Sequence, residues 1–428
     1  MSAFLFVLVL ATGPDTVELT LGQALELALR QSPVRTQVSV SQTQSASSLA
    51  RSVSGLLPTV SGTVGYAKLD LDQGHLPDLP STGWTGSLTL SQVVFDPSVF
   101  TALAGSVVYS GYYATDAHDK QARLIYDVTK AYLELLRARL LADAADAALR
   151  RAQENLRLVR ERERLNAVSK VDAMRAQVLE SQAVLARLEA EKGLAVAAET
   201  FKAMVNIEPG VTIRLSDELT EPSDLDISRP ESMLVEIRRK NPGLKLATSA
   251  AAAARITSWG KAARVLPSVS AYWTSEYADR QFPSSVARWR DHDQVSYGLR
   301  FSFPLLDLKS YVLDLVDAVN ESRRTRAAAR SAALTLNSTA TAAILSYQEA
   351  KQTYAHAASN LKLHQELYAL AQEQYRLGSL SLADLAGVEA DMAQAQATYT
   401  SALCDTYIQA AQVNYLLGSI ELPGKERR

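Results

Sequence analysis

Cysteine and histidine, which most often act as nucleophile, base or transition-metal ligand, are few and widely scattered in this chain of 428 residues. Its one cysteine, Cys404, lies in an alanine-rich stretch and excludes both an intramolecular disulfide and a cysteine-based metal cluster. The five histidines have neither metal-ligand spacing nor a partnered nucleophile: His75, His118, His292, His356 and His364. We therefore predict that the protein is not an enzyme and that it binds no cofactor or metal.

The acidic residues with the most informative spacing follow two short helix breaks. In the stretch YRLGSLSLADL, Gly378 is typical of a helix end, and Ser381 with Asp384 three residues later is typical of a helix start. A fainter copy of this pattern occurs earlier in the chain, at Asn166, Ser169 and Asp172. Each aspartate either only caps its helix or also places negative charge at the turn.

These two breaks belong to an internal duplication. The segment LLPTVSGTV at 56–64 aligns with VLPSVSAYW at 265–273, and Asp172 aligns with Asp384 near the other end of each copy. We therefore predict two structural repeats that follow each other and share one order of parts, 14–228 and 229–428.

The N-terminus carries a short apolar run that indicates how the protein is targeted. Residues 3–11 form an apolar run that is too short to span a bilayer as a helix but has the length of a signal-peptide core, so 1–13 is read as a signal peptide. A buried N-terminal strand is the alternative.

The formal net charge is −2 and both signs are interspersed, so we expect no binding of nucleic acid.

Each repeat contains two segments with the alternation of β-strands, at about 57–69 and 84–95 and at about 266–278 and 294–305. One side of each segment carries Ser and Thr, and the other carries aliphatic and aromatic residues. Lengths of about ten residues with Trp and Tyr near the ends suit tilted strands that cross a bilayer, although a soluble sandwich shows the same alternation. Four strands cannot close a barrel, so a membrane barrel must be shared between chains. Two copies would give a filled barrel of eight strands, and three would give twelve strands and a lumen.

Two long stretches without proline predict helical hairpins at about 98–205 and 308–417, with tips near 166–169 and 378–381. A helix from about 98 to 166, one arm of the first hairpin, extends roughly 100 Å. Heptad spacing along both arms predicts that each hairpin is an antiparallel coiled coil. On the returning arms this spacing falls on Val171, Met174, Val178, Ser181, Leu185 and Leu188, and on Leu382, Leu385, Met392 and Tyr399.

The duplication, the paired strands and the stretch YRLGSLSLADLAGVEADMAQAQATY at 375–399 together resemble the TolC-like family of outer-membrane efflux proteins. This resemblance implies a mixed α and transmembrane β fold, in which each chain gives four strands to a trimeric twelve-stranded barrel and its coiled-coil helices to a periplasmic α-helical barrel. It further implies an exit duct in the outer membrane: a homotrimer that meets a periplasmic adaptor and, through it, an inner-membrane pump. A soluble periplasmic coiled-coil adaptor or scaffold without a membrane barrel is the alternative.

The same resemblance assigns roles to residues at the two tips. Tyr375 and Asp384, with Asp172 as the first-half counterpart, take the positions of pore gate and selectivity residues. The positions of the periplasmic tip and of adaptor docking are Asn166, Ala167, Val168, Ser169, Gly378, Ser379, Leu380 and Ser381. Leu380 and Gly387 depart from the gate pattern, because the resemblance would place an arginine and an acidic residue there.

Overall fold

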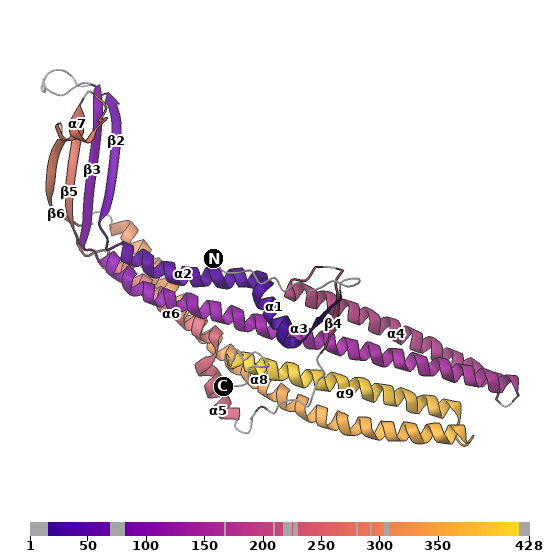
Figure 1. The fold of residues 1–428 in the computed structure, drawn as a ribbon. Coiled ribbons are helices and arrows are strands. Elements are labelled where there is room, and N and C mark those ends of the chain that lie inside the picture. Colours follow the sequence, from indigo (N-terminus) through magenta and orange to yellow (C-terminus); the bar gives the residue numbers. More distant parts are fainter. Residues whose placement is uncertain are drawn as a thin grey trace, which may run out of the picture. The chain divides into compact units, whose positions relative to one another are not determined.

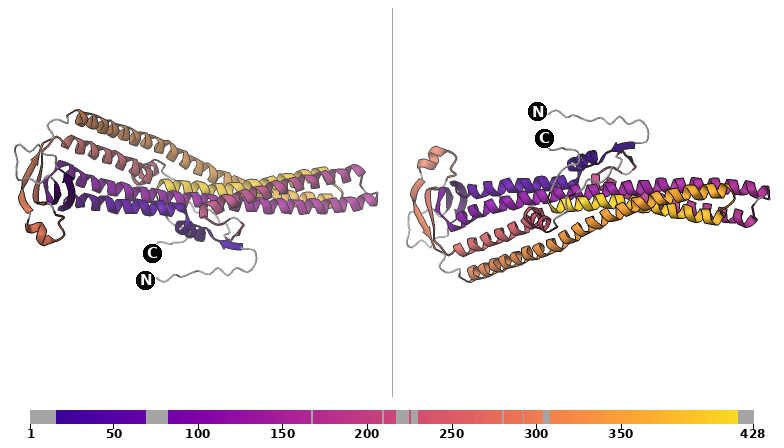
Figure 2. Two further views of the ribbon diagram at one scale, coloured as in Figure 1. Left: turned by 90° about the horizontal axis from the view of Figure 1, so that it is seen from above. Right: turned by 90° about the horizontal axis from the view of Figure 1, so that it is seen from below.

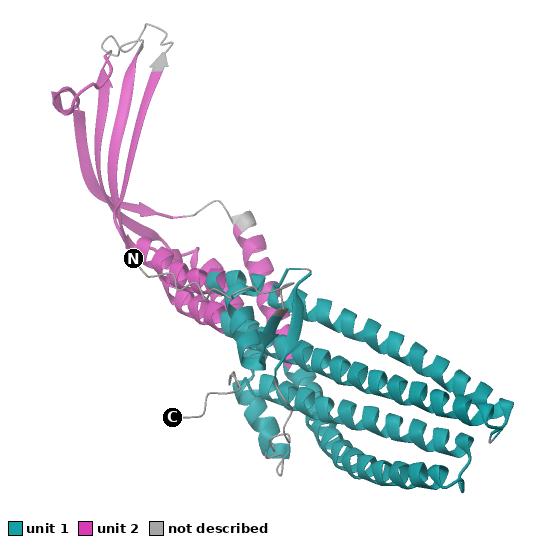
Figure 3. Ribbon diagram, turned by 45° about the vertical axis from the view of Figure 1, so that its right-hand side comes forward, with its two compact units in different colours: residues 1–39, 117–244, 333–428 teal, residues 40–116, 245–332 magenta. Residues whose placement is uncertain are grey.

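The computed structural model describes residues 16–68, 82–166, 168–208, 210–216, 225, 230–279, 281–291, 293–303 and 308–418. The expected signal peptide and Ala167 lie outside these ranges, as does most of the first strand-to-strand loop. Two compact units form (Figure 3): unit 1 comprises Met1–Ser39, Ala117–Leu244 and Ala333–Arg428, and unit 2 comprises Val40–Asp116 and Lys245–Ala332. Each unit therefore takes a part of both sequence repeats.

Unit 2 contains one four-stranded antiparallel sheet in the order β2-β3-β5-β6 (Figure 1). The first repeat supplies the hairpin of β2 (Thr59–Lys68) and β3 (Thr82–Phe95), and the second supplies β5 (Ser268–Asp279) and β6 (Asp293–Ser302). The two hairpins meet where β3 pairs with β5, so both repeats build the same sheet.

The strand register gives this sheet one apolar face and one hydroxyl face. One row of side chains across all four strands consists of Val60, Leu90, Trp273 and Tyr297. The next row, on the opposite face, consists of Ser61, Thr89, Thr274 and Ser296. Much of the apolar face is uncovered within the chain, since Val60 is 69% and Tyr297 78% exposed. The register thus places the two kinds of side chain as the sequence alternation predicted.

A helix adjoins each strand of the sheet in the sequence. These helices are α2 (Pro33–Ser54), α3 (Pro97–Arg164), α6 (Pro242–Ala263) and α8 (Leu308–Arg376). Within unit 2, Ser41 of α2 donates a 2.7 Å hydrogen bond to Asp116 of α3, and Lys261 of α6 pairs with Asp314 of α8 at 2.8 Å. Glycine brings α3 and α6 close together, because a methyl group added at Gly105 would lie 3.2 Å from Ile256.

Unit 1 contains two helical hairpins (Figure 2). In the first, α3 turns into α4 (Lys170–Val205), and in the second, α8 turns into α9 (Leu382–Leu416). Shorter elements accompany them: α1 (Leu21–Gln31), α5 (Pro230–Lys240), and a parallel pair of β1 (Thr16–Leu19) with β4 (Thr212–Leu215). Across the part of the chain that the structure describes, no helix has both the length and the apolar character needed to cross a membrane.

Equivalent tyrosines are buried in the two hairpins of unit 1, and each hydroxyl bonds to the backbone of a distant segment. Tyr132 of α3 is 1% exposed and donates a hydrogen bond to the Leu19 carbonyl at the end of β1. Its counterpart in α8, Tyr347, is equally buried and accepts a hydrogen bond from the Leu225 amide. Buried tyrosine hydroxyls need such partners, so the duplication extends to the packing of the core.

The predicted seams of the hairpins are correct for three arms and wrong for the fourth. The heptad positions of the outgoing arms, from Leu124 to Val159 along α3 and from Ala340 to Tyr375 along α8, are buried or half-buried. On α9 Leu382 and Leu385 are buried. On α4, however, the heptad residues Val171, Met174 and Leu185 are 57%, 60% and 66% exposed. The smaller Ala173 and Ala176 are buried instead, because small side chains let the helices approach closely. This arrangement leaves the large apolar stripe of α4 uncovered.

Candidate functional site: the hairpin tips

The outgoing helices α3 and α8 end in equivalent left-handed turns. At the end of α8, Gly378 has a φ of +78°, and its amide donates to the Tyr375 carbonyl at 3.1 Å. The next amide, of Ser379, donates to the Gln374 carbonyl at 2.9 Å, which completes a Schellman motif. At the end of α3, Asn166 takes the glycine position with a φ of +56°. Asparagine tolerates this region better than most side chains, so both helices stop at matching positions.

The returning helices α4 and α9 begin with the serine and aspartate caps that their spacing predicts. The Ser169 hydroxyl accepts from the Asp172 amide at 3.2 Å and donates to its carboxylate at 2.7 Å. These bonds, together with one from the Ser169 backbone, hold the pKa of Asp172 below its ordinary value. Ser381 makes the same hydroxyl contacts to Asp384, at 3.1 Å and 2.6 Å. Both carboxylates therefore stabilise the start of their own helix.

The tips of the two hairpins pack against each other through a small apolar cluster. Its buried members are Leu156, Val159, Ala173, Ala176 and Leu382, and Val168 and Tyr375 pack at its edge. Four of the buried residues come from the first hairpin, and Leu382 comes from the first turn of α9 in the second. The guanidinium of Arg162 lies 5.2 Å from the centre of the Tyr375 ring, which is a cation–π contact between the hairpins.

Charged side chains join the hairpins a few turns from the tips. The Arg151 guanidinium of α3 contacts the Glu389 carboxylate of α9 at 2.9 Å, and Asn155 donates to the same carboxylate at 3.3 Å. The Glu389 side chain is 16% exposed, so this pair is better shielded from water than a surface ion pair. Burial and the nearby Glu389 carboxylate raise the pKa of Tyr368. Farther along the same helices, Arg137 contacts Asp405 at 2.9 Å.

The sequence-predicted tip residues are thus brought together in part. Tyr375 and Val168 meet in the tip cluster, whereas Asp172 and Asp384 each contact the serine of their own cap. No hydrogen bond or ion pair among the described residues joins these two aspartates within one chain. Sequence reasoning missed the bridging residues Arg151 and Glu389. Glu389 could have been found, because it lies four residues after the seam residue Leu385 and therefore on the same helix face.

Two exposed apolar stripes flank this site on α4 and α8. On α4 the stripe consists of Val171, Met174, Val178, Leu185 and Leu188, all more than half exposed. On α8 it consists of Leu345, Leu363, Leu367 and Leu370, and it continues to Leu377 just after the helix, which is 68% exposed. Exposed apolar area of this extent on a soluble surface is typical of a contact with another macromolecule.

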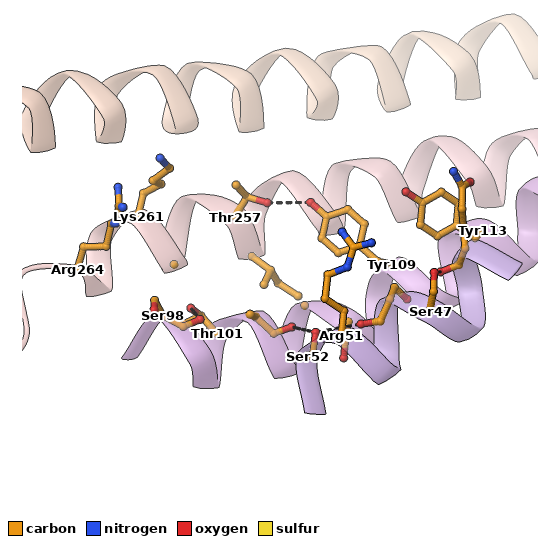
Figure 4. Close-up of a pocket in the computed structure, with 17 residues that line it drawn as sticks. Ser47, Arg51, Ser52, Ser98, Thr101, Tyr109, Tyr113, Thr257, Lys261 and Arg264 are labelled. Atoms are coloured by element: carbon orange, nitrogen blue, oxygen red, sulfur yellow. Dashed lines mark hydrogen bonds between the residues drawn. The ribbon is translucent and has the colours of Figure 1, made fainter. Parts of the chain in front are cut away.

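Unit 2 contains a groove of about 610 Å³ lined by α2, α3 and α6 (Figure 4). Tyr109 and Thr257 face each other across it with their hydroxyls 2.9 Å apart. Lys261 and Arg264 also line it, but both contact the Asp314 carboxylate, at 2.8 Å and 3.2 Å. Most of its serine and threonine hydroxyls bond to backbone carbonyls of their own helices, so the groove offers few unused donors.

Solved structures provide the comparison. No protein-family model matches the sequence. A search among curated proteins found no match either. The CmeC outer membrane channel of Campylobacter jejuni has a TM-score of 0.81 at 16% identity, covering 95% of this chain and 87% of that one. VceC, an outer membrane protein of Vibrio cholerae, has a TM-score of 0.76 at 14% identity, covering 93% of this chain and 96% of that one. The MtrE outer membrane channel of Neisseria gonorrhoeae in its open state has a TM-score of 0.73 at 16% identity, covering 95% of this chain and 91% of that one. The chain therefore has the fold of these channels over nearly its whole length, and the fold that the resemblance implied is confirmed.

Proposed function

We propose that this protein is the outer-membrane channel of a tripartite efflux or secretion system, in which it forms the exit duct through the periplasm and the outer membrane. The observation that carries the proposal is the sheet with one apolar and one hydroxyl face. A bilayer requires this division, because lipid covers the outer face of a barrel while water fills the lumen. The likeness to solved outer membrane channels supports the same conclusion.

The barrel of this proposal is closed by three copies of the chain. In the described sheet, β2 and β6 are edge strands of ten residues each. An unpaired backbone group in hydrocarbon costs several kcal/mol, so open edges of this length are not tolerated in a membrane. In a homotrimer, β6 of one chain pairs with β2 of the next, and the twelve strands form a barrel wide enough for a lumen.

The exposed stripes on α4 and α8 support contact between chains along the helices. They lie on different helices of one chain, so α4 of one copy would meet α8 of the next in a head-to-tail ring. Burying a leucine side chain that was exposed contributes about 1.5–3 kcal/mol. This contact accounts for a returning arm whose largest apolar residues point away from its own hairpin.

The hairpin tips form the proposed gate and docking site. In the trimer, three copies of Asp384 near the axis would give a ring of carboxylates that favours cations, with Asp172 as a second acidic position. Tyr375, held beneath Arg162, would keep the hairpins closed. The residues proposed to meet a periplasmic adaptor, and through it an inner-membrane pump, are Asn166, Ala167, Val168, Ser169, Gly378, Ser379, Leu380 and Ser381, of which Ala167 lies outside the described residues.

The test is the mass and the conductance of the protein extracted from outer membranes. Native mass spectrometry in detergent should give three chains, and the same sample in planar bilayers should produce discrete conductance steps. A monodisperse monomer without conductance, found in the soluble periplasmic fraction, would reject the channel and favour a soluble adaptor or scaffold.

A further inference from the structure

The segment between β5 and β6 folds back onto the apolar face of the sheet. It contains the short helix α7 (Val286–Asp291), which Figure 1 shows in front of the sheet near the end of β5. Trp289 of this helix stacks on Tyr277 with ring centres 5.3 Å apart, and its indole N–H donates to the Ser275 hydroxyl at 2.7 Å. Ser275 and Tyr277 belong to the apolar face, because they pair with Leu88 and Gly86 in register.

The segment covers the polar groups of that face. Ser275, which is 2% exposed, donates to the Asp293 carboxylate at 2.8 Å. The Tyr277 hydroxyl donates to the Gln281 carbonyl at 2.7 Å, and Arg288 of α7 contacts Asp279 at 3.1 Å. Without the segment, these hydroxyl and carboxylate groups would be exposed on the apolar face, which lipid covers in the proposed barrel. Placing polar groups in an apolar environment is unfavourable, and the segment lowers this penalty by covering the Ser275–Asp293 pair and by adding bonds to Tyr277 and Asp279.

Glycine at position 86 makes room for the indole. A methyl group added there would lie 2.5 Å from Cη2 of Trp289, which is too close for any real contact. Gly62 lies on the same face of the neighbouring strand, opposite Leu88, yet a methyl group there would be 3.8 Å from the nearest atom. The two glycines therefore differ in that only Gly86 lies beneath the Trp289 ring.

The outer surface of the segment is mixed in the way that a membrane interface favours. Val286 is 80% exposed, and Phe282 is 52% exposed with its ring edge-on to Trp84 at 4.9 Å. Trp84 belongs to the apolar face, so this surface continues that face toward the ends of the strands that lead away from the helices. Arg290, beside them in sequence, is exposed. Tryptophan rings such as that of Trp84 are enriched where headgroups meet acyl chains, and long cationic side chains such as Arg290 extend into the headgroup layer.

We propose that residues 281–291 form an interfacial anchor that lies on the outside of the barrel, against the lipid headgroup boundary of the leaflet farthest from the helices. The proposal rests on the membrane barrel proposed above. It assigns this strand connection to the lipid surface rather than to the pore mouth or the water above it. The contact of Trp289 with Gly86 fixes the depth of the segment in the membrane. Because the segment covers Ser275, Asp279 and Asp293, these ends of β5 and β6 can lie in the lipid.

Fluorescence quenching in reconstituted vesicles tests this position. In a Cys404→Ala background, the single substitutions Val286→Cys, Leu299→Cys and Ser296→Cys are labelled with bimane. Quenchers are placed in lipids near the headgroup, in lipids near the chain end, or in water as iodide. Interfacial segments lie about 5–10 Å into the headgroup boundary, so the label at 286 should be quenched about twofold more by the shallow lipid than by the deep one. The label at 299, on the apolar face, should favour the deep lipid. The label at 296, on the hydroxyl face, should respond to iodide alone.

The possible outcomes distinguish failure of the anchor from failure of the proposed membrane barrel. Strong iodide quenching at 286 without lipid quenching, or no quenching there at all, overturns the anchor while 299 and 296 still report a barrel. Lipid quenching at 296, or its absence at 299, overturns the barrel itself. Gly86→Ala should displace Trp289 and lower the shallow quenching at 286 by about half, since the methyl group has no space. Gly62→Ala is the matched control and should change nothing, and an equal response to both substitutions also overturns the anchor.

Discussion

Leu88→Arg measures whether the apolar face of the sheet meets lipid. Leu88 lies near the middle of β3, is 40% exposed, and has Gly62 and Ser275 opposite it on the same face. An arginine near the midplane of a lipid face costs about 2–4 kcal/mol per chain. At 1.4 kcal/mol per factor of ten, this lowers the folding equilibrium about 30- to 700-fold in each copy. In the three copies of the proposed trimer the cost is about 6–12 kcal/mol, which rivals the entire stability of a typical domain.

The matched control is the next residue in the strand, Ser87→Arg. Ser87 lies on the hydroxyl face, where its hydroxyl is 2.7 Å from that of Thr63. Losing this exposed hydrogen bond costs about 0.5–1.5 kcal/mol, and an arginine in a water-filled lumen adds little. Folding into lipid vesicles at increasing urea, followed by the heat-modifiable gel mobility of the trimer, reports both variants. Equal assembly of Leu88→Arg and Ser87→Arg would refute the assignment of the faces.

The other predictions concern the tips and the buried thiol. In planar bilayers, Asp384→Ala should weaken cation selectivity and block by multivalent cations, whereas Asp391→Ala, two turns farther along α9, should do much less; identical reversal potentials for wild type and both variants would leave Asp384 a cap worth about 1 kcal/mol. Glu389→Ala deprives the half-buried Arg151 of its partner and should loosen the hairpins, seen as a higher open probability; a conductance record like that of wild type would argue against this bridge as a closing contact. Burial raises the pKa of Cys404 to about 11, so its thiol stays protonated below that pH in the folded protein and gains reactivity only as the pH rises through it. Maleimide labelling near pH 8 should therefore be about a hundredfold slower in the folded protein than in urea, and fast labelling of the folded protein would contradict the burial of this residue.

Periodicity alone allowed the strands and the long helices to be predicted, because both depend on local patterns. The alternation of hydroxyl and apolar residues specifies the two faces of the sheet, and the caps at Ser169 and Ser381 follow from spacing within one turn. The stripe on α4 was misassigned for a physical reason. Heptad spacing identifies an apolar face, but it does not say whether that face packs within the chain or against another chain.

Features that depend on long-range contacts lay beyond the reach of the sequence. The pairing of β1 with β4 joins segments almost two hundred residues apart, and four residues are too few to show a reliable alternation. The connection between the two strands of the second repeat contains α7, and the position of Trp289 over Gly86 depends on the sheet being already formed. Spacing from Leu385 places Glu389 on the seam face of α9, but its contact with Arg151 likewise requires that α3 and α9 lie side by side.

The open edges of the sheet have a genetic consequence. A trimeric barrel is closed only if every β6 finds a β2, so each chain supplies one half of two joints and depends on both neighbours. A chain altered at one edge still offers its other edge and would be built into rings with normal copies. When normal and altered chains are made in equal amounts and mix at random, only about one ring in eight is wholly normal in a closed three-fold assembly. Edge substitutions in β2 or β6 should therefore be dominant over the wild-type gene, whereas substitutions that prevent the chain from folding should be recessive.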